Sequence, residues 1–245
     1  MSPRITLAVT TRVLTQLRRD HRTVAMMLLV PCFLLTLLWW MFEGNDVIFD
    51  RFGPPMLAMF PFIVMFLVTS VTTLRERSSG TLERLLSMPM GKGDLLLGYA
   101  LAFALVALLQ AALAVGLMVW LLDLHVAGPV WMLTLVAVLD AVLGTALGLL
   151  VSAFANTEFQ AVQFMPAVVL PQVLLCGLFV ARDAMPAVLE AISDVLPLSY
   201  AVDAMQSVQT TAEPAGDLAS DLAVVVVFAV ASLALGALTL RRQTA

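Results

Sequence analysis

The chain has 245 residues, of which 61% are hydrophobic and only 12% are charged, and its formal net charge is −4. A soluble domain carries about a quarter charged residues, and a globule of this size cannot hide so much apolar surface from water. The composition therefore excludes a soluble globular protein and predicts an all-α membrane protein.

The first 22 residues predict an amphipathic helix that lies in the plane of the membrane. At 100° per residue, the apolar side chains fall on one half of the helical wheel and the arginines fall on the other. The apolar half holds Ile5, Leu7, Val9, Val13, Leu14 and Leu17, and the basic half holds Arg4, Arg12, Arg18 and Arg19. A solvated basic leader is the alternative interpretation of residues 1–22.

Six apolar runs follow, and each is long enough to be a transmembrane helix, which needs about 20 residues to cross a core of about 30 Å. They cover residues 24–42, 55–74, 95–122, 130–154, 161–180 and 222–240. These runs use most of the chain, so we expect one transmembrane domain over residues 1–245. Pro61 lies in the second run, and Pro166 and Pro171 lie in the fifth. Because proline frees backbone carbonyls, these two helices should face protein or a cavity.

The loop between the second and third runs, residues 75–94, carries a short amphipathic pattern. Leu82, Leu85 and Leu86 share one face, and Glu76, Arg77, Glu83 and Arg84 surround it. Gly80 is expected to interrupt helical structure before this element, and Pro89 is expected to end the element. A helix of this kind, held in water by two membrane helices, fits a groove on another protein. A plain turn on the membrane surface explains the same periodicity.

The fourth run contains a charged residue, Asp140, near its middle. A charge there costs about 2.5–3.5 kcal/mol, so Asp140 must face the bundle interior or a seam between copies, paired or protonated. Gln110 and Gln172 are the expected partners. We interpret Asp140 either as a pathway or gating residue or as a packing hydrogen bond. Gly144 and Gly148 form a Gly-x-x-x-Gly spacing that favours close helix packing.

Residues 181–221 predict an outer helical segment with two short helices. Apolar side chains recur at helical spacing over 185–196, where Asp183 is expected to cap the helix and Pro197 to end it. A second short helix is expected over 198–209, before a turn at 210–217. Because both are too short to span a bilayer, they should dip into the outer leaflet or cover the outer mouth of the bundle.

The basic residues predict the orientation of the spans. Of the 13 lysines and arginines, all except Arg51 and Arg182 lie on one side if the N-terminus is inside. The positive-inside rule therefore places both termini in the cytoplasm.

The sequence offers no catalytic, cofactor-binding or metal site. The Gly91-Lys92-Gly93 run is too short for a phosphate-binding loop and lacks its hydroxyl residue. The chain has two histidines, His21 and His125, from which no zinc site or catalytic triad can be built.

Three segments resemble permeases of type-2 ABC exporters, in the same order along almost the whole chain. Residues 75–89, Arg-Glu-Arg-Ser-Ser-Gly-Thr-Leu-Glu-Arg-Leu-Leu-Ser-Met-Pro, are similar to the coupling segment of these permeases. Residues 152–166 and 170–179 supply the second and third matches, and the latter leads to Met185-Pro186 and to residues 196–204. The drug-exporter permeases of the daunorubicin-resistance type are the most similar.

The resemblance implies a multi-pass permease of the plasma (inner) membrane that works as a dimer, with itself or with a related permease. Two ATP-binding subunits would dock inside and hold ATP and magnesium, so this chain would not be an enzyme; no nucleic acid is expected. The implied coupling contacts are Glu76, Arg77, Gly80, Thr81, Leu82, Glu83, Leu85, Leu86 and Pro89, with a second contact at 156–160 that includes Asn156 and Glu158. The expected cargo is a hydrophobic or amphipathic compound, drug-like or lipid-like, that is moved outward.

Three other functions stay open at this point. A proton-coupled secondary carrier would use Asp140 and need no ATPase. A polysaccharide-exporting permease of the same class would show aromatic rows for sugar stacking, but the chain has only two tyrosines and four tryptophans. A membrane scaffold that transports nothing is disfavoured by the loop at 75–94.

Overall fold

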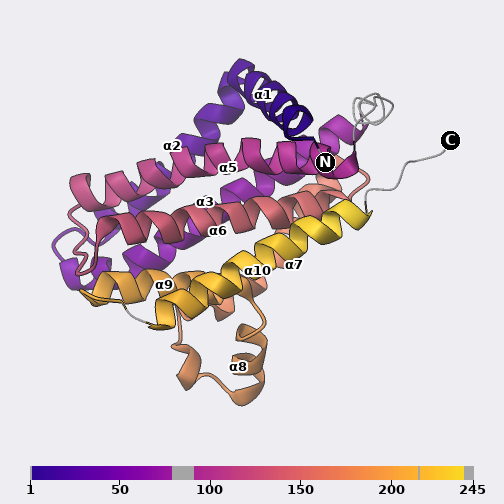
Figure 1. The fold of residues 1–245 in the computed structure, drawn as a ribbon. Helices are drawn as coiled ribbons and strands as arrows, with labels where there is room; N and C mark the ends of the chain where they lie inside the picture. Colours follow the sequence, from indigo (N-terminus) through magenta and orange to yellow (C-terminus); the bar gives the residue numbers. More distant parts are fainter. Residues whose placement is uncertain (1, 79–90, 215, 240–245) are drawn as a thin grey trace.

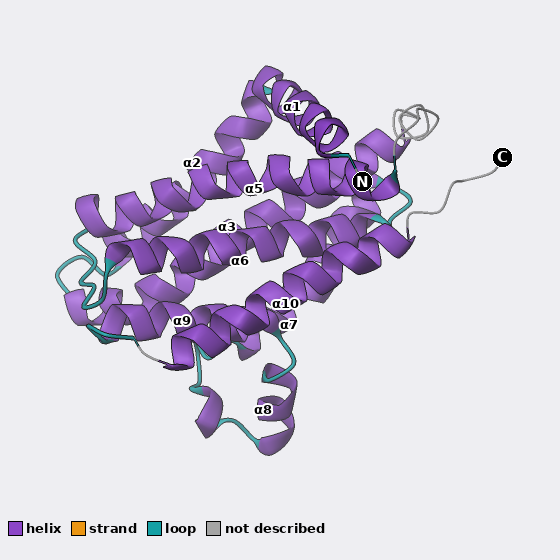
Figure 2. Ribbon diagram, in the orientation of Figure 1, coloured by secondary structure: helices purple, strands orange, loops and turns teal. Residues whose placement is uncertain are grey.

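The structure is a computed structural model that describes residues 2–78, 91–214 and 216–239. Within these ranges the chain forms helices and no strand, as Figure 2 shows. The elements, labelled in Figure 1, are α1 (Pro3–Arg19), α2 (His21–Met41), α3 (Asp46–Ser78), α5 (Lys92–Gly116), the π-helix η1 (Leu117–Leu121), α6 (Val130–Ser152), α7 (Glu158–Leu175), the 3₁₀ turn η2 (Arg182–Ala184), α8 (Ala187–Ser193), α9 (Pro197–Thr210) and α10 (Gly216–Thr239).

Six of these helices, α2, α3, α5, α6, α7 and α10, are long and apolar enough to cross a membrane. The six predicted spans and the all-α membrane class are therefore confirmed. The largest boundary differences concern α3, which begins at Asp46 rather than at residue 55, and α10, which begins at Gly216 rather than at residue 222. The helix α7 ends at Leu175 rather than at residue 180. Gly177 has a φ of +90°, and a left-handed residue just beyond a helix ends it.

The centre of the bundle is a close contact between α3 and α6, which run in the same direction. A Cβ atom on Gly144 would lie 2.5 Å from the Phe62 carbonyl oxygen, and one on Gly148 would lie 2.5 Å from the Phe66 carbonyl oxygen. The two backbones therefore touch without side chains between them. The packing interpretation of this glycine pair is confirmed.

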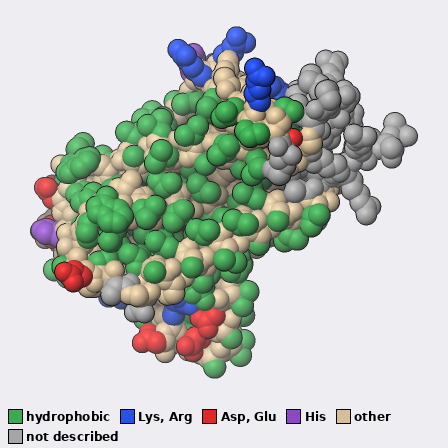
Figure 3. Space-filling view, viewed as in Figure 1, with side chains coloured by type: hydrophobic (Ala, Val, Ile, Leu, Met, Phe, Trp, Pro, Cys, Tyr) green, Lys and Arg blue, Asp and Glu red, His purple; other side chains and the backbone are tan. Residues whose placement is uncertain are grey.

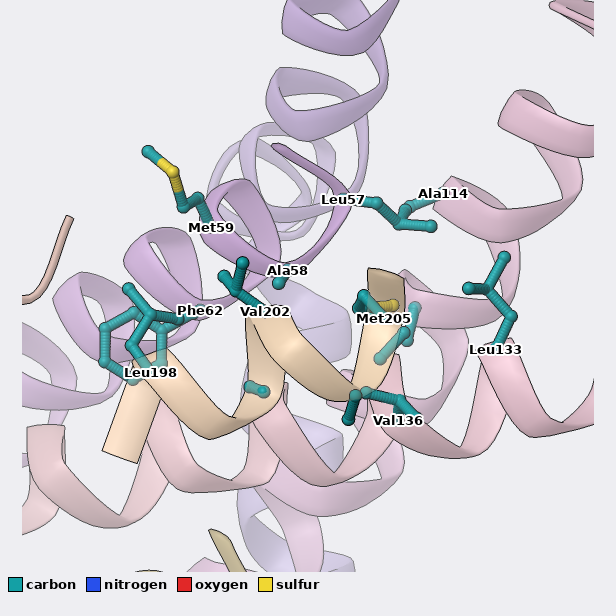
Figure 4. Close-up of a cluster of buried hydrophobic side chains, with 14 of the residues drawn as sticks. Leu57, Ala58, Met59, Phe62, Ala114, Leu133, Val136, Leu198, Val202 and Met205 are labelled. Atoms are coloured by element: carbon teal, nitrogen blue, oxygen red, sulfur yellow. The ribbon is translucent and has the colours of Figure 1, made fainter. Parts of the chain in front are cut away.

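A hydrophobic core surrounds the α3–α6 contact. Figure 4 shows side chains from α3, α5, α6 and α9 meeting there, with the labelled residues Leu57, Ala58, Met59, Phe62, Ala114, Leu133, Val136, Leu198, Val202 and Met205. All of these are less than about a tenth exposed. The helix α9, which is too short to span a bilayer, is thus part of the core and not a cover on its outer mouth.

The burial of the spans divides them into a central and a peripheral group. Of the most apolar 18-residue stretch in each span, 61% is buried inside the chain in α3 and in α6. The buried share is 17% in α2 and 22% in α7 and in α10. Pro61, on α3, is buried, as predicted for a span that faces protein. The peripheral helices α2, α7 and α10 leave wide apolar faces for lipid or for a partner.

The two ends of the bundle differ in charge, and we name them accordingly. The basic end is formed by α1, the last turn of α3 and the first turns of α5 and α7. The acidic end is formed by the α2–α3 loop, the loop between η1 and α6, and the last turn of α9. Figure 3 shows lysine and arginine side chains gathered over α1, and acidic side chains with a histidine at the opposite end.

Candidate functional site

At the basic end, an ion pair joins the two segments that were predicted to contact an ATPase. The Arg75 guanidinium donates from Nε to Glu158 Oε1 and from Nη2 to Glu158 Oε2, both at 3.0 Å. The two residues are 83 positions apart in the sequence. Arg75 lies in the last turn of α3 and Glu158 is the first residue of α7, so the pair ties the base of the 75–94 loop to the 156–160 segment.

Below this ion pair, apolar contacts and backbone hydrogen bonds hold the start of α7. Leu74, Ala155 and Ala161 form a buried cluster that joins α3 to α7. The Thr157 hydroxyl accepts a hydrogen bond from the Gln160 backbone N–H at 3.1 Å and caps the helix. The Asn156 backbone N–H donates to the Gln160 side chain at 2.9 Å. The 156–160 segment therefore has a fixed conformation while Asn156 and Glu158 stay exposed.

The N-terminal helix α1 contacts both roots of the 75–94 loop. At the entry to the loop, Glu76 is 5% exposed and its carboxylate lies 3.7 Å from the Arg12 guanidinium. At the exit, the buried Asp94 side chain accepts hydrogen bonds from the Ser2 N–H at 2.9 Å and from the Thr6 hydroxyl at 3.4 Å. The helix α1 therefore contacts both the end of α3 and the start of α5, which the 75–94 loop connects.

A notch in α5 fixes the position of α1. Gly98 has no side chain, and a Cβ there would lie 2.6 Å from the Val9 side chain. The Thr10 hydroxyl donates to the Gly98 carbonyl oxygen at 3.1 Å. Part of the predicted apolar half of α1 thus faces α5, whereas Leu7 is 61% exposed. The position of α1 in the membrane plane stays a prediction.

Asp20 caps α2 directly beside this site. Its carboxylate accepts from the Thr23 hydroxyl at 2.6 Å and from the Thr23 backbone N–H at 3.2 Å. These two hydrogen bonds, and more weakly the charge of Arg75, hold the pKa of Asp20 below its usual value. The group therefore stays ionised next to the Arg75–Glu158 pair.

Most of the predicted coupling residues lie outside the described part of the chain. These are Gly80, Thr81, Leu82, Glu83, Leu85, Leu86 and Pro89. The backbone of Arg77 belongs to the last turn of α3, but its side chain is also outside the described residues. Glu76, Asn156 and Glu158 are placed as reported above, and their role in coupling stays a prediction.

Asp140 lies inside the bundle, and its predicted partners are wrong. The side chain is fully buried, one turn before Gly144 on the side of α6 that packs against α3. Within the described ranges neither carboxylate oxygen has a hydrogen-bond partner. The Gln110 amide instead donates to the Met27 carbonyl oxygen at 2.7 Å, and the Gln172 amide donates to the Val168 carbonyl oxygen at 3.1 Å. Gln110 of α5 therefore bonds to the backbone of α2, and the Gln172 amide bonds to the backbone of its own helix.

The fifth span presents its prolines on the surface of the chain. Pro166 and Pro171, both inside α7, are exposed. The prediction that this span faces protein or a cavity is therefore not met by the chain on its own. Gln172, on the opposite side, is buried, and its side-chain oxygen accepts from the Leu198 N–H at 3.4 Å.

The segment after the fifth span runs back through the bundle. The last turn of α9 reaches the acidic end, where the Gln209 carbonyl accepts from the Ala127 N–H at 2.9 Å. The first turn of α9 puts Leu198 beside Phe62 (Figure 4), level with Gly144 on α6. Gly144 is 14 residues beyond the start of α6, which places this level about 20 Å along that helix. The short helix predicted over 198–209 is confirmed as α9, and its first turn lies deep within the helical bundle.

The hairpin of η2 and α8 differs from the predicted first outer helix. The helix α8 covers only Ala187–Ser193, and its N-cap is Pro186. Asp183 lies in η2, so the prediction that Asp183 caps this helix is wrong. The 185–196 helix is shorter than predicted because Pro186 stands before the helix and the chain turns again before Pro197.

A charged cluster that the sequence reasoning missed holds this hairpin to α9. Arg182 forms ion pairs with Asp194 and with Asp203 of α9, and its guanidinium carbon lies 4.8 Å from the centre of the Tyr200 ring. The Tyr200 hydroxyl donates to the Asp194 carbonyl oxygen at 2.8 Å. The available signal was that Arg182 is one of only two basic residues in the predicted outer segments. The cluster lies beside the first half of α9.

Comparison with known proteins identifies the family of this chain. The sequence matches the ABC-2 type transporter family over residues 5–210. It is 30% identical, over 171 residues, to the probable multidrug ABC transporter permease YbhS of Escherichia coli (strain K12), an alignment that covers 69% of this chain and 44% of YbhS. It is 24% identical, over 171 residues, to the linearmycin resistance permease protein LnrN of Bacillus subtilis (strain 168), with the same two coverages. It is 24% identical, over 164 residues, to the ABC transporter G family member 20 of Dictyostelium discoideum, covering 67% of this chain and 22% of that protein.

The chain spans less than half the length of each of these relatives. The family match nevertheless covers most of the chain and includes both ends of the 75–94 loop. This multi-pass membrane protein therefore belongs to the ABC-2 type transporter family.

Proposed function

We propose that this chain is the transmembrane permease subunit of an ATP-driven ABC exporter. ATP and magnesium are bound, and ATP is hydrolysed, by separate partner subunits that dock at the basic end. The observation that carries this proposal is the Arg75–Glu158 ion pair, which joins the two segments that resemble ATPase contacts. A partner that pushes on the 75–94 loop acts at the same time on the 156–160 segment and, through Glu76 and Asp94, on α1.

The proposed cargo is a hydrophobic or amphipathic compound, drug-like or lipid-like. Two of the related proteins are named as a probable multidrug permease and a linearmycin resistance permease, which supports this class. The excess of arginine at the basic end supports a cytoplasmic location for that end, in the plasma (inner) membrane. The helix α1 and the last described turn of α10 lie at this end (Figure 1), so we place both termini inside.

A second copy of the chain is proposed to cover the face of α7. Exposed prolines in a membrane helix require neighbours that satisfy the freed carbonyls, and charges at bilayer depth require water or protein. Pro166, Pro171 and the Arg182 cluster lie on this side of the chain. Two copies that face each other across α7 would satisfy both requirements and enclose a pathway, which supports a homodimer with two ATP-binding subunits.

The coupling proposal predicts that changes in the 75–94 loop uncouple the exporter without removing the partner. Gly80→Pro or Glu83→Lys is expected to lower cargo-stimulated ATPase activity of the co-purified complex by at least about tenfold. The reason is that the loop then no longer fits its groove on the partner. Ser87→Ala is the matched control within the same loop and should leave the activity unchanged. Wild-type stimulated turnover in both test variants would sink the coupling role of this loop.

The ion pair predicts a different pattern, in which function changes much more than stability. Arg75→Glu and Glu158→Arg each place like charges together and should uncouple transport from ATP hydrolysis. The double variant restores the pair in reverse and should recover at least half of the wild-type transport per ATP. The side chains are 60% and 49% exposed, so the single changes should cost only about 1 kcal/mol or less in stability. Transport into inverted vesicles and thermal unfolding measure the two effects, and additive losses in the double variant would contradict the pairing.

A further inference from the structure

A cavity of about 650 Å³ opens at the acidic end, far from the basic end where the partner ATPase is proposed to dock. It lies between the end of α2, the start of α3, η1 and the loop that leads to α6. Pockets for small organic ligands commonly enclose about 300–1,000 Å³. This cavity therefore has the size for such a ligand and belongs to no part of the coupling site.

One wall of the cavity is aromatic. Trp39 and Phe42 come from the end of α2, and Phe49 comes from the first turns of α3. The Phe42 ring stacks on Phe52, with ring centres 5.8 Å apart, and Phe49 is buried, so neither ring is free to turn away. Aromatic faces of this kind attract both apolar groups and cations.

The rim of the cavity carries three carboxylates, Glu43, Asp46 and Asp123. All three are exposed, and no ion pair or hydrogen bond to another described residue occupies their side chains. His125 does not neutralise them, because its Nδ1 lies 3.1 Å from Asp50 and its backbone N–H donates to the same Asp50 carboxylate. The mouth of the cavity therefore carries three carboxylates, and no lysine or arginine side chain in the described part of the chain lines it.

The shape of the cavity is fixed before any ligand arrives. Asp123 has a φ of +53°, and the Leu124 N–H donates to the Met118 carbonyl oxygen at 2.9 Å, which turns the chain back over the end of η1. Leu124 and Met118 pack onto Gly53 of α3, where a Cβ atom would lie within 3 Å of both. A site with fixed walls loses little entropy on binding.

We propose that this cavity binds an organic cation, an ammonium-type group attached to an apolar or aromatic body. The carboxylates attract the charge, and the rings of Trp39, Phe42 and Phe49 hold the body and the face of the cation. A metal ion fits the site less well, because no group of three or more His, Cys, Asp or Glu side chains in the described ranges is placed to hold one. The same chemistry is offered by a free organic cation and by the quaternary ammonium headgroup of a lipid.

Binding of tetraphenylphosphonium to the purified protein in lipid nanodiscs tests this proposal. The triple variant Glu43→Gln, Asp46→Asn, Asp123→Gly should bind this cation about tenfold more weakly, since each exposed charge contributes up to about 1 kcal/mol. Asp183→Asn, Glu190→Gln, Glu213→Gln removes the same charge outside the cavity and should bind as the wild type does. Tetraphenylborate, an anion of the same shape, should not bind to the cavity.

Two further measurements make the result decisive. Trp39→Leu should also weaken the cation while it leaves the carboxylates in place, and Asp123→Gly alone should keep the unfolding temperature, because glycine adopts a positive φ without strain. Phosphatidylglycerol has no quaternary ammonium headgroup, so tetraphenylphosphonium binding in phosphatidylglycerol discs reports a free cation as the ligand. If binding is weakened by competition only in phosphatidylcholine discs, the competing ligand is the lipid headgroup. Equal losses in the two triple variants, or equal affinity for the borate, would overturn the proposal. None of these readouts depends on transport, so the site can fail while the exporter function stands.

Discussion

A Gly144→Leu variant is expected to yield almost no folded protein. A Cβ atom at this position would lie 2.5 Å from the Phe62 carbonyl oxygen, and the atom it meets belongs to backbone that cannot rotate away. Inserting side-chain atoms into a packed core commonly costs about 1–3 kcal/mol, and a clash with backbone along the central helix pair should exceed that range. Gly148→Leu, which would meet the Phe66 carbonyl oxygen in the same way, should behave alike.

The matched control for this prediction is Gly236→Ala on α10. Its nearest neighbours, Leu150 backbone atoms, would lie 3.8 Å from the new Cβ, which is an ordinary contact distance. The yield of monodisperse protein in mild detergent and the unfolding temperature measure both variants. If Gly144→Leu elutes and unfolds like the Gly236→Ala control, the α3–α6 contact described above does not exist.

The second large effect is expected at Asp140, where Asp140→Lys should prevent folding and Asp140→Asn should be tolerated. The carboxylate is fully buried and has no hydrogen-bond partner in the part of the chain that the structure describes. An uncompensated charge in such a place costs several kcal/mol, so the side chain is stable there only in its neutral form. Asparagine keeps the size and removes the ionisable group, whereas lysine adds both a charge and length.

Asp140→Asn also separates the exporter from a proton-coupled carrier. An exporter driven by a partner ATPase should keep ATP-dependent transport in vesicles when this carboxyl group is gone. A carrier that moves protons through Asp140 would lose transport driven by a pH gradient, although the protein stays folded. Glu213→Lys, on an exposed loop, is the control for Asp140→Lys. It measures how much a lysine lowers folding yield and stability at a position where the side chain stays in solvent.

The spans and their order could be predicted because length and hydropathy alone decide them. The rotation of each helix about its axis is not decided in this way. Gln110 and Gln172 lie in the predicted spans, but they face the backbone at Met27 and Val168 instead of Asp140. Which side chains meet across two apolar helices depends on packing over the whole bundle, and no local pattern in the sequence carries that information.

The candidate site was predicted in part. The resemblance identified the 75–94 and 156–160 segments, but only the structure shows that Arg75 and Glu158 join them. The contact of α1 with Asp94 was also missed, because the residues that meet are about 90 positions apart and no local pattern in the sequence links them. The Arg182 cluster was missed although its members are close in sequence, because each of its ion pairs depends on how the α8 hairpin and α9 are placed.

The glycine seam between α3 and α6 has a mechanical consequence. Where two backbones touch with no side-chain layer between them, sliding one along the other brings a Cβ atom against a carbonyl group, so α3 and α6 are expected to move together over this contact. The helix α3 has 33 residues and is about 50 Å long. A displacement applied to Arg75, in the last turn of α3, is therefore expected to move α6 together with α3 at the level of Gly144 and Gly148.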